Sequence, residues 1–256
     1  MNKTKITVAT VGHMPPEFDK PKILNWKSSV FSIVGEIENY SLNVESDGEN
    51  WEFTDSNLES VLPQKFSGEF LIAIVNVRLE GNWYSRRLKN NRVVFTAHEI
   101  KDILQFFSIP FENAIYRLLY AYTLYFRRNG NTIPLLNEKS TGFTHDETRG
   151  CLFDMNGIKT DIHHSCDNPI ICSGCIEGLK KDRVSTEIIT TVQKEIKNIR
   201  KPLFYRMLSF VKMHPILSLS ISLFTALLVG VFGSLIASYL FELITKSKCI
   251  TNKVRL

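Results

Sequence analysis

Alternating apolar and polar positions, together with short apolar runs, dominate residues 1–100 and predict strands. The clearest cases are residues 5–11, 70–79 and 92–96. Two shorter segments, 41–45 and 51–54, flank the turn Ser-Asp-Gly-Glu-Asn and predict a hairpin. Over residues 23–37, just after Pro21, the apolar positions follow the helical period instead, and they predict a helix.

Two successive helices are predicted next, at 100–107 and 111–128, and the second ends at Asn129–Gly130. Their apolar faces are expected in the core: Ile100, Ile103, Leu104, Phe107, Ile115, Leu118, Leu119 and Tyr122. An order of strand, helix, several strands and then helices favours a mixed α/β or α+β domain. The polar loop 81–91, which carries Arg86 and Arg87, is expected to be exposed between strands.

The most apolar part of the chain is residues 216–241, which contain no charged side chain and follow Pro215. A helix of this length reaches roughly 39 Å, against a hydrocarbon core of about 30 Å, so it can cross a bilayer once with some tilt. We therefore predict a single transmembrane helix, assigned to residues 215–244, and membrane lipids as its surroundings. A short tail, 245–256, follows it.

Small residues recur at every fourth position of this segment: Ser218, Ser222, Ala226, Gly230, Ser234 and Ser238. Residues four apart lie near one another on a helix, and small side chains let two backbones approach closely in lipid. The pattern predicts a packing face and a homo-oligomer. Ser and Gly are also common in membrane helices without any such role.

The net charge of +5 is unevenly distributed. Residues 180–212 carry nine basic against three acidic side chains, whereas residues 1–179 carry 18 against 22. The basic excess therefore flanks the predicted span, where it would attract anionic lipid, and we expect lipid rather than nucleic acid as the polyanion. The sequence divides into a domain at 1–179, a basic helical connector at 180–214, the span and the tail.

Within the connector, Ile189, Val192, Ile196 and Ile199 follow a 3, 4, 3 spacing. This spacing indicates either the seam of a short coiled coil or a helix docked on the domain. The first residues lack the apolar core of a secretory signal, so the domain is expected in the cytoplasm, with the span as a single-pass C-terminal anchor. In a reducing compartment its cysteines are expected to be thiols or metal ligands.

Candidate chemistry is concentrated at 145–175, which holds four of the five cysteines. Cys172 and Cys175 form a Cys-x-x-Cys turn that can place two thiolates on one ion, and Cys151 with a further residue can complete a tetrahedral structural zinc site. The residues alone leave the fourth ligand open among His145, Asp146, His163, His164 and Cys166. Buried free cysteines and a redox Cys-x-x-Cys are the other interpretations.

The spacing resembles that of the archaemetzincins, a zinc metalloprotease family with the motif H-E-x-x-H-x-x-G-x-x-H-C-x4-C-x-M-x17-C-x-x-C. His145 and Cys151 are six apart, as are the last histidine and second cysteine of the motif, and Gly142 lies three before His145. Cys172 and Cys175 fall one position late, and Met155 falls two late. The resemblance implies a metzincin-like mixed sheet with a zinc-stapled C-terminal segment.

The departures from this motif concern catalysis. At the positions of the two other histidines and the catalytic glutamate the chain has Leu135, Lys139 and Leu136, and Asp146 replaces the first cysteine. A hydrolytic zinc needs three protein ligands, an open position and a general base. The resemblance therefore implies a protease-like scaffold without its catalytic metal, in which His145 is recruited to the structural zinc with Cys151, Cys172 and Cys175. No catalytic residue is assigned.

Another metal motif, His98-Glu99-Ile100-Lys101-Asp102, could hold a metal through His98 and Asp102 with Glu99 as base. A solvated helix face explains the same string. The main hypothesis is thus a membrane-anchored, non-catalytic, zinc-stapled sensor, adaptor or effector that responds to a protein or a small molecule. The alternatives are a membrane-anchored metallohydrolase using this motif or His163–His164, and a pore lined by the serine stripe.

Overall fold

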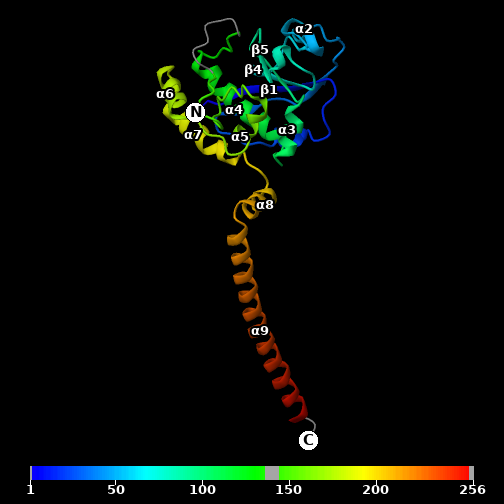
Figure 1. Cartoon of the computed structure of the whole chain (residues 1–256), viewed down its shortest axis with the longest axis vertical. Coiled ribbons are helices and arrows are strands. Elements are labelled where there is room, and N and C mark those ends of the chain that lie inside the picture. Colours follow the sequence, from blue (N-terminus) through cyan, green and yellow to red (C-terminus); the bar gives the residue numbers. More distant parts are fainter. Residues whose placement is uncertain (1, 136–143, 254–256) are drawn as a thin grey trace. The chain divides into compact units, whose positions relative to one another are not determined.

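The computed structural model describes residues 2–135 and 144–253, with side chains as far as Phe241, and its first unit, residues 1–201, is built on a sheet. The strands of the described part of that unit are β1 (Thr4–Val11), β2 (Phe31–Ile33), β3 (Glu38–Tyr40), β4 (Phe70–Val75), β5 (Ser85–Leu88) and β6 (Arg92–Thr96). They follow the order β2-β1-β4-β6-β5, and β3 also pairs with β1 (Figure 1). All pairs are parallel except β5 with β6, so β5 is an antiparallel strand at the edge of the sheet.

Helices cover both faces of this sheet. Those of the first unit are α1 (Lys20–Leu24), α2 (Asp55–Val61), α3 (Ile100–Phe106), α4 (Glu112–Arg128), α5 (Ile162–Ser165), α6 (Ser173–Lys181) and α7 (Thr186–Glu195). Short 3₁₀ turns occur at η1 (Glu49–Trp51), η2 (Glu80–Asn82), η3 (Lys159–Asp161) and η4 (Ile196–Asn198). A mixed α/β fold, as predicted, is confirmed.

The central strand β4 shows why both faces must be covered. Phe70, Ile72 and Ile74 belong to the large core that contains α4, whereas Ala73 and Val75 belong to a smaller core under α2. Because successive side chains of a strand point to opposite faces, a strand buried on both sides has an unbroken apolar sequence. The two helix faces predicted at 100–107 and 111–128 lie against the large core.

Three predictions in the first half of the chain differ from the structure. The helix predicted at 23–37 ends at Leu24, and Phe31–Ile33 is the edge strand β2 instead. The Ser28 hydroxyl accepts from the N–H groups of Val30 and Phe31 at 3.1 and 3.4 Å, which favours a turn over a helix, and Thr4 of β1 pairs with Phe31.

The hairpin predicted from 41–45 and 51–54 is absent from the described residues, where a loop and η1 occupy that region. The Asp47 carboxylate accepts from both the N–H and the hydroxyl of Thr54, at 3.0 and 2.6 Å, and Thr54 in turn caps α2. The segment predicted to be a polar loop with Arg86 and Arg87 contains strand β5.

The segment after α6 is part of the domain. Ile189, Val192, Ile196 and Ile199 are all buried in the large core, which corresponds to the docked-helix alternative for the 3, 4, 3 spacing. The boundary predicted between residues 179 and 180 therefore falls after Lys201 in the structure.

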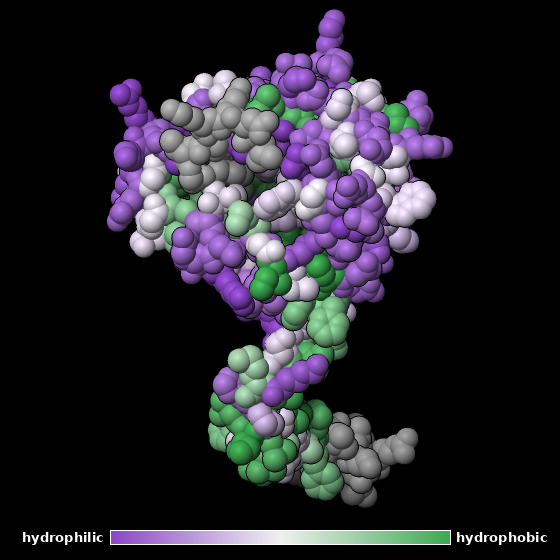
Figure 2. Space-filling model, turned by 45° about the horizontal axis from the view of Figure 1, so that its top comes forward, coloured by the Kyte–Doolittle hydropathy of each residue, from purple (hydrophilic) through white to green (hydrophobic). Residues whose placement is uncertain are grey.

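Residues 202–256 form the second unit, which contains α8 (Leu203–Met213) and α9 (Pro215–Lys253). The part of α9 from Pro215 to Phe241 is long and apolar enough to cross a membrane, with a mean hydropathy of 2.2 and no residue buried. Figure 2 shows its hydrophobic surface in green.

Three hydroxyl groups of this helix form hydrogen bonds within it. Ser218, Ser220 and Thr225 donate to the carbonyl oxygens four residues earlier, at 2.8, 3.0 and 2.8 Å. A lipid environment provides no water for unpaired polar groups, so this arrangement suits a span.

Candidate metal centre

Helix α6 positions the Cys-x-x-Cys pair. Cys172 is the N-cap residue of this helix, and its sulfur accepts from the N–H of Cys175 at 3.5 Å. The second thiol follows one turn later, on the same side of the helix start. The start of α6 therefore presents two sulfurs at the spacing of a Cys-x-x-Cys metal site.

Backbone pairing brings the other two residues to α6. The N–H of Leu152 donates to the carbonyl of Ile170 at 2.7 Å, which places Cys151 beside the residues leading into α6, and the N–H of Cys172 donates to the Cys151 sulfur at 3.5 Å. His145 is held by a bridge to Asp154, with its N–H on the Phe153 carbonyl at 3.2 Å. The segment 145–155 therefore folds back on itself, so that both side chains reach the same point.

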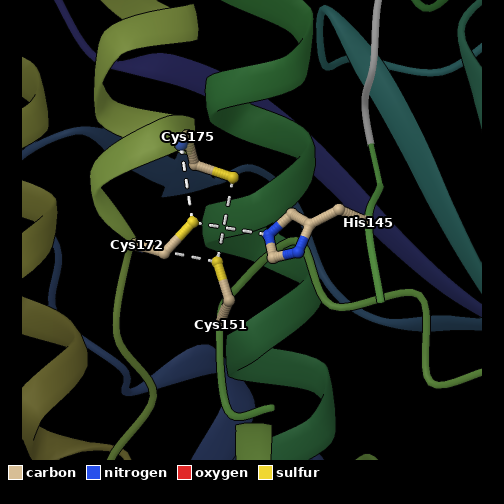
Figure 3. Close-up of side chains that lie close together, drawn as sticks. All are labelled: His145, Cys151, Cys172 and Cys175. Carbon is tan, nitrogen blue, oxygen red and sulfur yellow. Dashed lines mark hydrogen bonds between the residues drawn. The ribbon is translucent and has the colours of Figure 1, made fainter. Parts of the chain in front are cut away.

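Four potential metal ligands converge there (Figure 3). The Nε2 atom of His145 lies 3.5 Å from the Cys172 sulfur, the sulfurs of Cys151 and Cys175 are 3.9 Å apart, and all four ligand atoms lie within 4.8 Å of one another. Tetrahedral zinc, with Zn–S bonds of about 2.3 Å and Zn–N bonds of about 2.0–2.1 Å, requires roughly 3.8 Å between sulfurs and roughly 3.5 Å between sulfur and nitrogen. The observed spacings fit such an ion.

The electrostatics of the cluster favour one thiolate. The contact with the Cys175 sulfur and the hydrogen bond from the backbone N–H of Cys172 lower the pKa of Cys151 to about 5 although burial opposes the shift. The same contact between the two sulfurs, together with burial, raises the pKa of Cys175. A divalent cation would replace the proton shared by the two sulfurs and compensate the charge of the thiolates.

A carboxylate supports the histidine. Glu147 lies 3.3 Å from Nδ1 of His145, the ring nitrogen that faces away from Cys172. Such a contact fixes the tautomer in which Nε2 is free to bind a metal. Sequence reasoning missed this residue, and only its separation of two positions from His145 could have indicated it.

The alternative fourth ligands lie outside the cluster. Cys166 is fully buried, burial raises its pKa to about 12, and its carbonyl accepts from Asn113. His163 stacks on Phe107 with ring centroids 3.7 Å apart, and its neighbour His164 lies against it at 3.9 Å. Asp146 accepts weakly from the N–H of Gly157 at 3.5 Å.

The pentapeptide at 98–102 has different partners. Lys159 lies 2.9 Å from the Glu99 carboxylate and lowers its pKa, and Asp102 contacts Lys101 at 2.7 Å. Among the residues that the structure describes, three or more potential metal ligands converge only at the His145 cluster. This geometry agrees with the interpretation that residues 98–102 lie on a solvated helix face and do not bind a metal.

Searches with protein-family models and among curated proteins find no match for this chain. Among solved structures, the fold is similar to that of archaemetzincin from Methanopyrus kandleri, with a TM-score of 0.43 and 11% identity, over 71% of this chain and 96% of that one. This is the family that the cysteine spacing resembles, and the likeness concerns the fold alone. The motif positions Leu136, Lys139 and Gly142 lie outside the described residues.

Proposed function

We propose that this protein is a membrane-anchored domain stapled by a structural zinc ion, without peptidase chemistry. The observation that carries the proposal is the convergence of one imidazole and three cysteine sulfurs at tetrahedral spacing, in a chain that also contains a helix able to cross a membrane. The zinc ligands would be His145, Cys151, Cys172 and Cys175.

The ligand number supports a structural role. A catalytic zinc keeps one coordination position for water or substrate, whereas four protein ligands fill the tetrahedron. A set of three cysteines and one histidine belongs to structural sites. Zinc at this place would fasten α6 to the segment 145–151 and would not activate a water molecule.

Metal analysis of the full-length protein in detergent tests this assignment. We expect about one zinc per chain, because three cysteines with one histidine is a typical structural zinc set. Cys172→Ala should lose the metal, whereas the matched Cys166→Ala variant, which removes a buried thiol outside the cluster, should retain it. A zinc-free wild-type chain, or full zinc in Cys172→Ala, would contradict the proposal.

The same preparation tests the rival hydrolase. A second, exchangeable metal together with hydrolytic activity that Glu99→Gln abolishes would show a catalytic site at the pentapeptide. Under our proposal that variant has no effect on metal content, because Glu99 contacts Lys159 instead.

The proposal also concerns the side of the membrane on which the domain lies. The domain would lie on the cytoplasmic side, held through α9, with the basic residues of 180–212 near anionic lipid. Flotation of the chain with lipid vesicles, and protection of either terminus from added protease in sealed membranes, measure these properties. A chain that stays soluble without detergent would contradict the anchor.

We further propose that α9 self-associates through its small residues and that a protein or small-molecule trigger at the domain changes this packing, so that the protein acts as a sensor, adaptor or membrane effector. Rows of residues four apart run obliquely around a helix, by about 26° to its axis, so two copies would touch over a short central part. The contact would centre on Ala226, Gly230 and Ser234, with Ser222 and Ser238 at its limits.

Crosslinking in membranes tests the stripe. Replacing both Gly230 and Ser234 by Leu should abolish crosslinked oligomers, because the added side chains separate the backbones. Thr225→Leu places a leucine roughly 160° around the helix from that pair and should leave the oligomers intact. Oligomers that persist in the double variant would refute this packing face, and ion leakage that depends on α9 would favour a pore.

A further inference from the structure

Arg117 is a buried cation in the middle of α4. Arg117 is 2% exposed. Among the side chains that the structure describes, no carboxylate oxygen lies within 4.0 Å of its guanidinium nitrogens. Its terminal nitrogens donate to the Tyr84 hydroxyl at 3.3 Å and to the backbone carbonyl of Asp154 at 2.7 Å, while Nε has no acceptor. Neutral oxygens alone therefore solvate this charge.

The nearby carboxylate of Asp154 is engaged elsewhere. Its two oxygens accept from the N–H groups of Gly150, at 3.2 Å, and Asn156, at 2.8 Å. A buried ion without a hydrogen-bonded counter-ion is costly, and proteins balance it by a partner or by a ligand. Among the residues that the structure describes, no carboxylate takes the partner position at Arg117.

A cavity of about 160 Å³ lies beside Arg117, between β5, α4 and residues 144–155. Two further guanidinium groups line it, those of Arg86 and Arg87, and Asp154 is the acidic residue of its lining. Arg86 is paired with Asp55 at 2.5 Å. Arg87 donates to the Tyr125 hydroxyl. The lining therefore brings three cationic side chains and one acidic side chain together.

The remaining walls are apolar or aromatic, and include Trp83, Leu118, Tyr122 and Phe153. Pockets for drug-sized ligands begin at roughly 300 Å³, so this cavity suits a smaller molecule. A cationic group at one side and aromatic walls around it select a ligand that has an oxyanion joined to a small apolar body.

From these observations we infer that the cavity beside Arg117 binds a small organic acid, with its carboxylate or phosphate toward the guanidinium and its apolar part against the aromatic walls. The site is separate from the His145 cluster and needs neither the membrane helix nor its assembly. It would give the domain a ligand, which goes beyond the zinc staple and the anchor.

Fluorine NMR on the full-length, zinc-loaded protein in detergent tests this inference with three probes. These are 4-fluorobenzoate, 4-fluorophenyl phosphate and the neutral 4-fluorobenzamide. We expect saturable binding of at least one anion, about tenfold or more tighter than the amide, since the amide lacks the charge that meets Arg117. The tighter of the two anions identifies the oxyanion as carboxylate or phosphate.

Two variants locate the binding. Arg117→Gln removes the charge and should weaken binding about tenfold or more. Ala121→Met leaves Arg117 in place but fills the cavity from the same helix, so it keeps the test valid if the first variant does not fold. Arg78→Gln, which removes an arginine paired with Glu52 outside the cavity, should bind like the wild type.

Several results would overturn the inference. One is the absence of anion binding at concentrations up to about 10 mM, a dissociation constant that corresponds to about 3 kcal/mol of affinity. The others are equal binding of the neutral amide and unchanged binding in both cavity variants. The zinc content of every sample is measured alongside, so that a change at the metal site is distinguished from a change in ligand binding.

Discussion

Glu195, the last residue of α7, ties this helix to the start of β2 and to α4. Its carboxylate accepts three hydrogen bonds, from the Ser28 hydroxyl at 2.7 Å, the Ser29 N–H at 2.7 Å and the Tyr120 hydroxyl at 2.8 Å. Both hydroxyls also accept from other groups, Ser28 from the N–H of Val30 and Tyr120 from the indole N–H of Trp26. They must therefore donate to Glu195.

Glu195→Gln cannot preserve this arrangement. If the amide nitrogen replaces Oε2, it faces the two hydroxyl donors. If it replaces Oε1, it faces the Ser29 N–H, which is also a donor. Hydrogen bonds to charged groups contribute about 1.5–3 kcal/mol each, and the half-buried position lets water replace part of the loss. We expect the free energy of unfolding to fall by about 2–3 kcal/mol, or roughly 4–12 °C in the melting temperature for a domain of this size.

Thermal unfolding of the full-length protein, followed by circular dichroism in detergent, measures the effect. Glu187→Gln, an exposed acidic residue on the same helix, should change the stability by less than about 1 kcal/mol. In a double-mutant cycle, Glu195→Gln and Tyr120→Phe should be non-additive by about 0.5 kcal/mol or more. A Glu195→Gln variant as stable as the wild type would refute the reasoning.

Three further changes probe other parts of the fold. Gly68→Ala should destabilise by about 1–3 kcal/mol in urea unfolding, since its Cβ would lie 2.5 Å from a backbone nitrogen of β1, whereas Gly174→Ala meets nothing within 4 Å and should be tolerated. Ile196→Ala should cost about 2–5 kcal/mol in the same assay, because the side chain is 1% exposed in the core; no loss would place α7 outside the domain. The pKa of Glu99 is lowered by Lys159, so the stability that this carboxylate contributes is present above its unfolded pKa and lost as pH falls through the folded one. Glu99→Gln should therefore flatten the pH dependence of unfolding below about pH 4.5, and an unchanged slope would contradict the contact.

The central strands and α4 could be predicted from the sequence because one physical cause dominates there. A strand buried on both faces has no polar position, and the run from Phe70 to Val75 has none. In α4 the apolar period and the boundaries at Pro110 and Asn129–Gly130 agree with each other. Where several local signals point to one element, distant contacts do not change it.

The edges of the sheet could not be predicted in this way. The spacing of apolar residues over 23–37 is compatible with a helix, and the outcome depends on the Ser28 hydroxyl and on pairing with β1, a contact distant in sequence. Strand β5 carries Ser and Arg because it is an edge strand and most of its residues are half-buried. Its signal was the turn after it, residues 89–91 between the paired Leu88 and Arg92, where Asn90 and Asn91 both have positive φ, of 59° and 55°, a conformation that asparagine tolerates.

The candidate site was predictable in part for the same reasons. Cys172 and Cys175 are local to one helix start, so their spacing alone places them together. The fourth ligand depends on how the segment 145–155 folds back, through the bridge between His145 and Asp154. Cys166 has the same chemistry and is nearer in sequence to Cys172, yet it is buried elsewhere.

The C-terminal part of the domain is held by polar contacts as well as apolar ones, and these contacts have different chemistry. The ligand cluster joins α6 to the segment 145–151, an ion pair joins Arg128 of α4 to Asp182 at the end of α6, and Glu195 joins α7 to residues 28–29. The chain then leaves the domain directly after Lys201. With zinc in the ligand cluster as proposed, chelation would weaken the first attachment, salt the second and substitution of Glu195 the third, since each depends on a different interaction.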